Sequence, residues 1–388
     1  MKIELAHRIR ELPPYLFAHI DALKEAERAK GRDIIDLGIG DPDLPTPPHI
    51  VAALQTAAAD PGTHRYPAYA GMRQLRAAAA RFYEARFHVR LDPDREVIAL
   101  IGSKEGIAHF PFAFVNPGDV VLVPDPGYPV YATLSRFAGA EVHRMPLTRA
   151  RGFLPDLAAI PAEVARRAKL MWLNYPNNPT GALATPEFYR DVVAFALAHD
   201  IIVGSDMAYS ETYLEGPPPP SFLETPGAME CGLEFCSLSK TYNMTGWRAG
   251  FAGGHPALVA GLGKVKTNVD SGVFDAVQRA AIAALEGDQG CVAEMRRIYR
   301  ERRDLFCDGL AQAGFDVIRP RATFYVLCAT PGGMPAIDLT ARLLTEAGVV
   351  ATPATGFGPG GEGFIRFSLT AATERLREAV QRLAAVKL

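Results

Sequence analysis

Short apolar runs alternate with helix-like stretches along most of the chain. The apolar runs predict strands at 96–102, 119–126, 169–176, 200–206, 234–239 and 249–254. Between them, apolar residues recur at intervals of three and four, which predicts helices at 106–115, 129–139 and 187–200. This alternation predicts an α/β fold with a mainly parallel sheet.

The pattern changes after about residue 280. A long charged helix is predicted at 294–314, and strand-like segments follow at 315–320, 322–329 and 363–370. We therefore predict a large domain at 48–285, and an N-terminal arm at 1–47 together with a smaller α+β domain at 286–388. The length of 388 residues also favours two domains, because it exceeds what one hydrophobic core usually supports.

Composition favours a small-molecule ligand. The 41 basic residues nearly balance the 43 acidic ones, so no charge excess favours nucleic acid or an anionic membrane. The chain has no secretory signal pattern and no apolar run of membrane-spanning length. The five cysteines are odd in number and have no CxxC spacing, which predicts buried free thiols and neither a disulfide framework nor a metal site. We expect a cytoplasmic protein.

Five polar loops begin where predicted strands end. They lie at 102–106, 125–129, 174–181, 205–209 and 237–240. In open α/β sheets, ligands bind beyond the carboxyl ends of the strands. The loops therefore predict one shared site.

Lys240 follows an apolar strand in SLSKTYNMTGWR. A lysine in such a turn is more often a solvated surface residue. Its neighbours favour a function, because Ser237 and Ser239 offer hydroxyl donors and Arg248 offers the bidentate cation that suits a phosphate. In the loop GSKEG at 102–106, Ser103 and Lys104 begin the next predicted helix, and their backbone N–H groups form another anion-binding arrangement.

Four further positions have both a structural and a functional interpretation. Asp206 after a strand is commonly a helix cap, but its carboxylate could keep a pyridine nitrogen protonated, with Tyr209 beside it. Asn178 lies in an ordinary turn sequence, yet its amide could meet cofactor and substrate oxygens. Tyr128 could pack or could cover a cofactor ring. Arg366 lies in an apolar strand, so it should meet either a buried carboxylate or a ligand carboxylate.

Together, NNPTG at 177–181, the Asp206 and Tyr209 pair, SLSK with Arg248, and IRFSL at 365–369 resemble the class I and II aminotransferases of pyridoxal-phosphate (PLP) fold type I. The resemblance covers nearly the whole chain. It implies a large domain with a mainly parallel seven-stranded sheet flanked by helices, plus a smaller α+β domain. It also implies PLP as cofactor, pyridoxamine phosphate as its alternate form, and ping-pong transfer of an amino group between an amino acid and a 2-oxo acid.

Several segments, among them LNYPNNPTGA and KVKTNVDSGVFDAVQ, are similar to the bacterial LL-diaminopimelate aminotransferases. That resemblance implies transfer between LL-diaminopimelate and 2-oxoglutarate, on a route to lysine. An aminotransferase specific for aspartate, alanine or an aromatic amino acid, and a carbon–sulfur lyase of the same fold, remain alternatives. A DNA-binding regulator is disfavoured, because only about forty residues precede the first site loop.

The resemblance also implies roles for individual residues. Lys240 would carry PLP as a Schiff base, Asp206 would pair with the ring nitrogen, Tyr209 with the ring oxygen, and Tyr128 would stack on the ring. The implied phosphate site comprises Ser103, Lys104, Ser237, Ser239, Arg248 and, from the second subunit of a homodimer with shared active sites, Tyr66. The implied substrate contacts are Tyr15, Gly40, Asn178, Arg366 and, from the second subunit, Asn268.

Two segments depart from the family's pattern. Residues 205–209 are SDMAY where relatives have a sequence nearer HDAAY. Leu327 and Cys328 stand where many relatives have a tryptophan. We expect both segments to lie close to the site and to bear on substrate preference.

Overall fold

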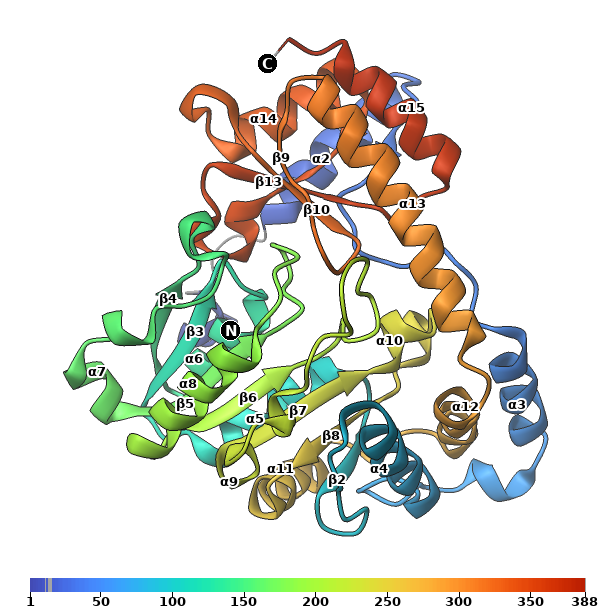
Figure 1. The fold of residues 1–388 in the computed structure, drawn as a ribbon, viewed down its shortest axis with the longest axis vertical. Helices are drawn as coiled ribbons and strands as arrows, with labels where there is room; N and C mark the ends of the chain where they lie inside the picture. The colour runs from blue at the N-terminus through green and yellow to red at the C-terminus, as the bar shows by residue number, and fades with distance from the viewer. Residues whose placement is uncertain (11, 13–15, 388) are drawn as a thin grey trace.

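The computed structural model describes residues 1–10, 12 and 16–387. Its main element is a seven-stranded sheet with the order β2-β8-β7-β6-β5-β3-β4 (Figure 1). Strand β8 pairs antiparallel with β2 and β7, and the other neighbours pair parallel. The strands are β2 Val97–Leu100, β3 Val120–Asp125, β4 Glu141–Pro146, β5 Ala168–Asn174, β6 Ile202–Asp206, β7 Gly232–Ser237 and β8 Gly250–Gly254. The predicted α/β fold with a mainly parallel sheet is confirmed.

The sequence pattern missed strand β4. The six predicted strands of this sheet are all present, and most of their residues are buried. Strand β4, at the edge next to β3, has the sequence EVHRMP and is mostly only half-buried. An edge strand with polar residues lacks the continuous apolar run that marks the central strands of a parallel sheet.

Successive side chains along the strands of the large sheet point to opposite faces and pack in two different hydrophobic cores. In β3, Val121 and Val123 pack on one face with α5, α6 and α11, whereas Val120 and Leu122 pack on the other with α4, α8 and α12. This alternation follows from the two-residue period of strand side chains. The helices of this part are α3 Pro48–Ala58, α4 Arg73–Phe87, α5 Ser103–Phe114, α6 Pro129–Phe137, α7 Ala162–Arg167, α8 Pro186–Ala198, α9 Ala228–Cys231, α10 Leu238–Thr241, α11 Pro256–Val269 and α12 Asp275–Glu286.

A smaller antiparallel sheet, with the order β12-β13-β10-β9, lies in the upper part of Figure 1. The long helix α13 runs from the region of α12 up to this sheet. A short parallel pair, β1 with β11, joins the N-terminal region to the C-terminal part. The elements are α1 His7–Arg10, α2 Leu16–Ala29, β1 Ile35–Asp36, α13 Gly290–Gln312, β9 Asp316–Ile318, β10 Tyr325–Ala329, α14 Ala336–Arg342, β11 Val349–Val350, β12 Thr352–Pro353, β13 Phe364–Ser368 and α15 Thr373–Ala384.

The five cysteines are all free thiols, as predicted. Four are buried, whereas Cys291, near the exposed start of α13, is only partly buried, so the expectation that all five are buried was wrong for this one. Within the described residues, no helix combines the length and the apolar character needed to cross a membrane.

Candidate active site

A cavity of about 590 Å³ lies at the carboxyl ends of the central strands. Asn174, Asp206 and Ser237, the last residues of β5, β6 and β7, line it, and all five predicted loops contribute. The convergence predicted from the sequence is therefore present. The cavity brings together twelve of the predicted site residues: Gly40, Ser103, Lys104, Tyr128, Asn178, Asp206, Tyr209, Ser237, Ser239, Lys240, Arg248 and Arg366.

One end of the cavity is built to hold an anion. Helix α5 begins there with Ser103 and Lys104, and the first N–H groups of a helix lack intrahelical acceptors. Gly102 precedes them with φ of +73°, and a Cβ atom there would lie 2.3 Å from Nη2 of Arg248. Glycine thus lets the guanidinium lie directly against the loop. With the hydroxyls of Ser237 and Ser239 nearby, the donors suit a phosphate group.

Asp206 is a buried carboxylate held by two donors. Tyr131 donates its hydroxyl hydrogen to Oδ2 at 2.7 Å, and the backbone N–H of Ala208 donates to Oδ1 at 3.1 Å. Burial raises the pKa of Asp206 to about 6, although both hydrogen bonds oppose the shift. Tyr131 is itself fixed by stacking on Trp172, with ring centroids 5.2 Å apart. A carboxylate so desolvated is stabilised by a cation placed in the cavity.

Lys240 extends its amine into the cavity, where Nζ donates to the carbonyl oxygen of Gly40 at 2.8 Å. Burial lowers the pKa of Lys240 to about 8. The nearby charge of Asp41 opposes this shift, whereas Arg248 and Arg366 add to it. A larger share of Lys240 is therefore neutral near physiological pH than for a solvated lysine, as a nucleophile or base requires.

Arg366 lies between two aromatic rings, with its guanidinium carbon 4.0 Å from the ring centre of Tyr325 and 4.6 Å from that of Phe357. Nη1 donates to Oδ1 of Asn178 at 2.8 Å and Nη2 to the carbonyl oxygen of Gly38 at 2.7 Å, while Nε has no partner. The sequence left open whether this arginine meets a protein carboxylate or a ligand carboxylate. Within the described part of the chain Arg366 has no ion-pair partner, which favours a ligand.

Within the described residues, the other two buried arginines both have carboxylate partners. Arg302 forms a bidentate ion pair with Asp43, at 2.7 and 2.9 Å. Arg303 lies 2.8 Å from a carboxylate oxygen of Asp304 and 3.3 Å from one of Glu215. A buried guanidinium normally has a carboxylate partner. Because Arg366 lies at the cavity, its position indicates that an anionic ligand supplies that partner.

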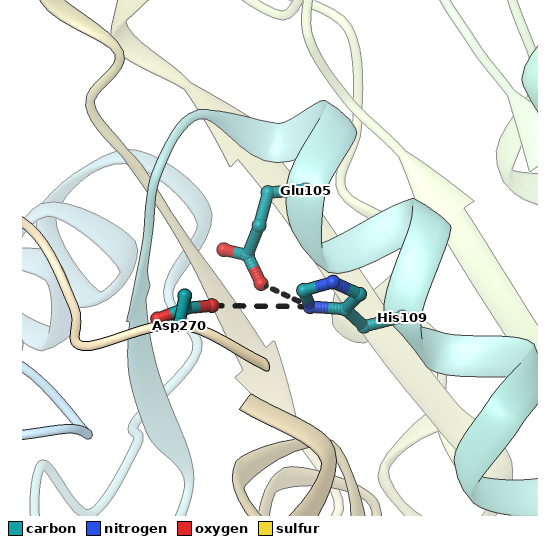
Figure 2. A group of neighbouring side chains, drawn as sticks. All are labelled: Glu105, His109 and Asp270. Carbon is teal, nitrogen blue, oxygen red and sulfur yellow. Dashed lines mark hydrogen bonds and ion pairs between the residues drawn. The ribbon is translucent and has the colours of Figure 1, made fainter. Parts of the chain in front are cut away.

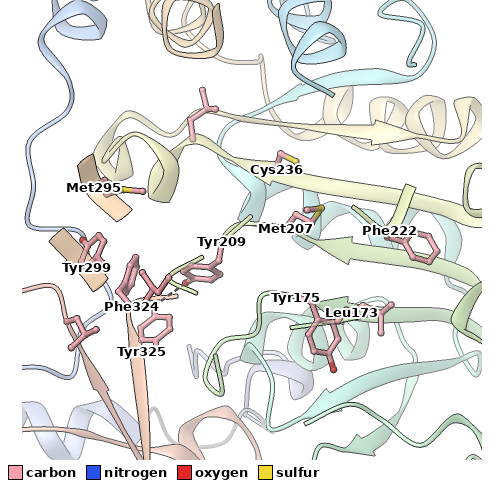
Figure 3. Packing of buried hydrophobic residues seen from close by; sticks show 14 of the residues in the cluster. Leu173, Tyr175, Met207, Tyr209, Phe222, Cys236, Met295, Tyr299, Phe324 and Tyr325 are labelled. Atoms are coloured by element: carbon pink, nitrogen blue, oxygen red, sulfur yellow. Dashed lines mark hydrogen bonds between the residues drawn. The ribbon is translucent and has the colours of Figure 1, made fainter. Parts of the chain in front are cut away.

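Tyr325, on β10, is a site residue that the sequence analysis missed. Its hydroxyl lies 3.0 Å from that of Tyr209, and a Cβ atom on Gly40 would lie only 1.9 Å from it. Figure 3 shows the Tyr209 and Tyr325 rings side by side, next to Phe324. Tyr325 thus lies against Tyr209, Gly40 and Arg366, three residues that the sequence placed in the site. Phe357 and Tyr131 were missed as well.

Two of the predicted residues that the structure describes do not line the cavity of this chain. Tyr66 is 89% exposed, and Asn268 is exposed with its amide donating to the Lys264 carbonyl of its own helix at 2.8 Å. Both were predicted to act in the second subunit's site, and that prediction stays open. Tyr15 lies outside the described residues.

In the two departures from the family's pattern, the differing residues themselves do not line the cavity, although Asp206, Ala208 and Tyr209 of the first segment do. Ser205 is buried and donates to Glu234 at 3.0 Å, on the strand face opposite to Asp206. Met207, Leu327 and Cys328 are buried in the hydrophobic cores. Leu327 packs in the small cluster that contains Phe357, a lining residue. Both segments therefore lie close to the site as expected, since 205–209 contributes to the cavity and Leu327 lies opposite Arg366 in the register of β10 and β13; their effect on substrate preference stays a prediction.

Comparisons with known proteins agree with this geometry. The family described as aminotransferase class I and II matches residues 32–383. A protein of Syntrophobacter fumaroxidans named LL-diaminopimelate aminotransferase is 60% identical over 378 residues, 97% of each chain. One of the same name from Desulforudis audaxviator is 58% identical, over 97% of this chain and 96% of that one. The substrate-bound structure of BacF from Bacillus subtilis has a TM-score of 0.94 at 40% identity, covering 99% of this chain and 98% of that one.

Proposed function

The chain belongs to the aminotransferases of class I and II, and from this premise we propose that it moves an amino group between LL-diaminopimelate and 2-oxoglutarate with PLP as cofactor. The observation that carries the proposal is one cavity that holds a lysine of lowered pKa, a desolvated carboxylate and an arginine without an ion-pair partner among the described residues. The substrate rests on relatives named LL-diaminopimelate aminotransferase, which are 58 to 60% identical over nearly the whole chain.

The donor set fits PLP. The helix start at Ser103, the hydroxyls of Ser237 and Ser239, and Arg248 would hold its phosphate. Asp206 would pair with the ring nitrogen, and Tyr209 and Asn178 would meet the ring oxygen. Tyr128, at the start of α6, would lie against the ring. Lys240 would attach the cofactor through its amine.

Bound PLP supplies a carbonyl carbon that reacts with amines and a ring that takes up electrons when a bond at the substrate's α-carbon breaks. The carboxylate of Asp206 would favour a proton on the ring nitrogen and so make the ring a better electron acceptor. Nζ of Lys240 would take the proton from the substrate's α-carbon and deliver it to the former carbonyl carbon of the cofactor. Arg366 binds the α-carboxylate and so orients the α-carbon toward Lys240.

The substrate proposal is tested by single amino acids. We expect LL-diaminopimelate and glutamate to convert the PLP form to the pyridoxamine form at least about tenfold faster than aspartate, alanine or tyrosine, because only the first two fit the proposed donor and acceptor sites. Stopped-flow absorbance of the purified protein measures each rate. Faster conversion by one of the other three would mean a different specificity. Release of ammonia and pyruvate from cystathionine without an added oxo acid would instead support a carbon–sulfur lyase.

Attachment of PLP should depend on pH through Lys240. Only the neutral amine has the free electron pair needed for attack, and burial lowers the pKa of this amine to about 8. We expect the attachment rate of the cofactor-free protein to rise about tenfold per pH unit below this value and to level off above it. Absorbance after rapid mixing at pH values from about 6.5 to about 9.5 gives the profile. A rate that still climbs tenfold per unit near the upper end would contradict the lowered pKa.

We also propose a homodimer in which Tyr66 and Asn268 reach the second subunit's site. Both side chains are exposed in the single chain, beside the exposed apolar residues Tyr69, Val269 and Phe274 of the same two segments. These segments lie together, since a Cβ atom on Gly272 would lie 3.2 Å from the carbonyl oxygen of Ala68. The five free thiols support a cytoplasmic location.

A further inference from the structure

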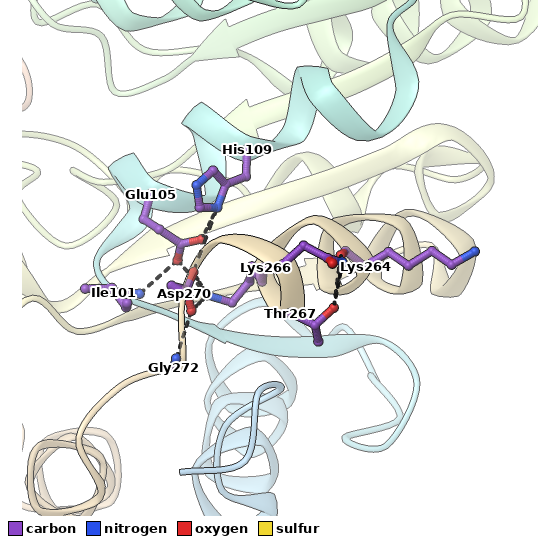
Figure 4. A network of polar contacts seen from close by, with 9 residues as sticks. Ile101, Glu105, His109, Lys264, Lys266, Thr267, Asp270 and Gly272 are labelled. Carbon is purple, nitrogen blue, oxygen red and sulfur yellow. Dashed lines mark hydrogen bonds and ion pairs between the residues drawn. The ribbon is translucent and has the colours of Figure 1, made fainter. Parts of the chain in front are cut away.

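A buried ionic network lies directly behind the phosphate end of the cavity. Glu105 follows Ser103 and Lys104 in the first turn of α5, and its Oε2 accepts the backbone N–H of Ile101 at 3.0 Å. The side chain therefore closes the loop that presents the helix N-terminus to the cavity. Figure 4 shows Glu105 between this loop and α11.

Lys266 on α11 is the cation of the network. It is fully buried, and its Nζ donates to Oε2 of Glu105 at 2.9 Å and to the carboxylate of Asp270 at 3.2 Å. Asp270 in turn accepts the backbone N–H of Gly272 at 2.8 Å. The network thus links the phosphate loop to the segment 268–272, which begins with Asn268.

Glu105, His109 and Asp270 lie close enough to hold a metal ion, since their ligand atoms are within 4.8 Å of one another (Figure 2). The buried ammonium of Lys266 already bonds to both carboxylates. A divalent cation would be repelled by this neighbour and would compete for the same oxygens. The charges therefore indicate a closed ionic network and not a metal site.

The network is costly to break because its charges are desolvated. Burial raises the pKa of Glu105, but hydrogen bonding to His109 and the charge of Lys266 outweigh this effect and hold it below its usual value. Without Lys266, the two partly buried carboxylates would lose the ammonium that bonds to both of them and keep the imidazole of His109, which lies 2.7 Å from Glu105 and 4.0 Å from Asp270. They would separate, and Glu105 could no longer hold the N–H of Ile101 in place.

We propose that Glu105 and Lys266 are positioning residues that fix the phosphate-binding loop of the active site and tie it to the segment carrying Asn268. The inference rests on the proposed function, because it assumes that the loop binds the cofactor's phosphate. Neither residue lines the cavity, so both act through the backbone of residues 101–104. One set of charges then holds the chain's own phosphate site and a segment proposed to reach the second subunit.

The test compares Lys266→Met with Lys264→Met. Lys264 lies two residues earlier on α11, is exposed and points away from the network (Figure 4). Affinity is measured for inorganic phosphate and for pyridoxamine phosphate, which cannot attach covalently to Lys240, at a temperature where circular dichroism shows each variant folded. We expect Lys266→Met to weaken both ligands about tenfold and Lys264→Met to change them less than twofold.

Two further measurements separate positioning from general destabilisation. The double variant Glu105→Gln with Lys266→Met removes the carboxylate that lost its ammonium partner, so it should bind phosphate more tightly than Lys266→Met alone. If the two substitutions acted independently, their losses of phosphate affinity would add. Hydrogen exchange should rise in both 101–105 and 267–272 of Lys266→Met. Should Lys266→Met not fold, Glu105→Gln carries the test, with an expected loss of about threefold.

The outcomes are distinct. If the unmodified protein does not bind pyridoxamine phosphate, the proposed function fails. If it binds, and Lys266→Met binds phosphate as tightly as Lys264→Met does, the positioning role is wrong. Should Lys266→Met not fold, the same conclusion follows if Glu105→Gln binds phosphate as tightly as Lys264→Met does. Faster exchange confined to 267–272 would also overturn it, because the loop would then be held by other contacts.

Discussion

Replacing Lys240 by alanine should lower the rate of amino-group transfer by at least about 10⁴-fold. In the proposed mechanism, the variant loses both the amine that attaches the cofactor and the base that removes the α-proton. Neither the Gly40 carbonyl that Nζ contacts nor the Phe324 ring near it can replace the amine, and Lys104, which also lines the cavity, lies at its phosphate end. Single-turnover absorbance with LL-diaminopimelate measures the loss.

Two controls show what the amine contributes. Lys240→Arg keeps a positive charge near the Gly40 carbonyl but cannot act as a base near neutral pH, so it should be as inactive as alanine. Lys264→Ala removes an exposed lysine from α11 and should retain the activity of the unmodified protein. A Lys240→Ala protein that keeps more than about 1% of the rate would exclude this lysine as the base.

The sequence predicted the centre of the site because its residues lie at consecutive strand ends. Asp206 and Ser237 are each the last residue of a buried strand, and Lys240 follows within one turn. Parallel strands bring such ends to one edge of the sheet, so order along the chain translates directly into proximity. The apolar runs also predicted the six strands of the large sheet that are mostly buried.

Residues that reach the site from a packed element gave no such signal. Tyr131 has helical spacing and looks like a core residue, yet its hydroxyl bonds to Asp206. Tyr325 lies in the apolar strand ATFYVLCA, and only the contact between the two sheets brings it to Tyr209. The available signal for Tyr325 was its polar hydroxyl in an otherwise apolar strand, just as the guanidinium was the signal for Arg366. Positions near the site in sequence were also misleading, since Ser205 precedes Asp206 but faces away from it.

The second large effect should follow from Arg366→Met. Loss of the guanidinium removes the proposed partner of the α-carboxylate, and we expect kcat/KM for LL-diaminopimelate to fall about 10³-fold, which corresponds to roughly 4 kcal/mol for one partner of a buried charge pair. The loss should appear mainly in KM, because Lys240 and Asp206 keep their hydrogen-bond partners. Steady-state kinetics, together with a measurement of PLP affinity, separates substrate binding from cofactor binding.

A matched substrate makes the assignment specific to the carboxylate. An amine that carries the same side chain but lacks the α-carboxylate should react equally slowly with Arg366→Met and with the unmodified protein, since neither can form the ion pair with it. Arg366→Lys should fall between the two proteins, because an ammonium offers charge without the planar fork that lies between Tyr325 and Phe357. If Arg366→Met lowered kcat/KM equally for the amino acid and for the amine, the arginine would instead act by holding Asn178, to which it donates at 2.8 Å. The difference between the two substrates therefore decides whether Arg366 binds the substrate or supports its neighbour.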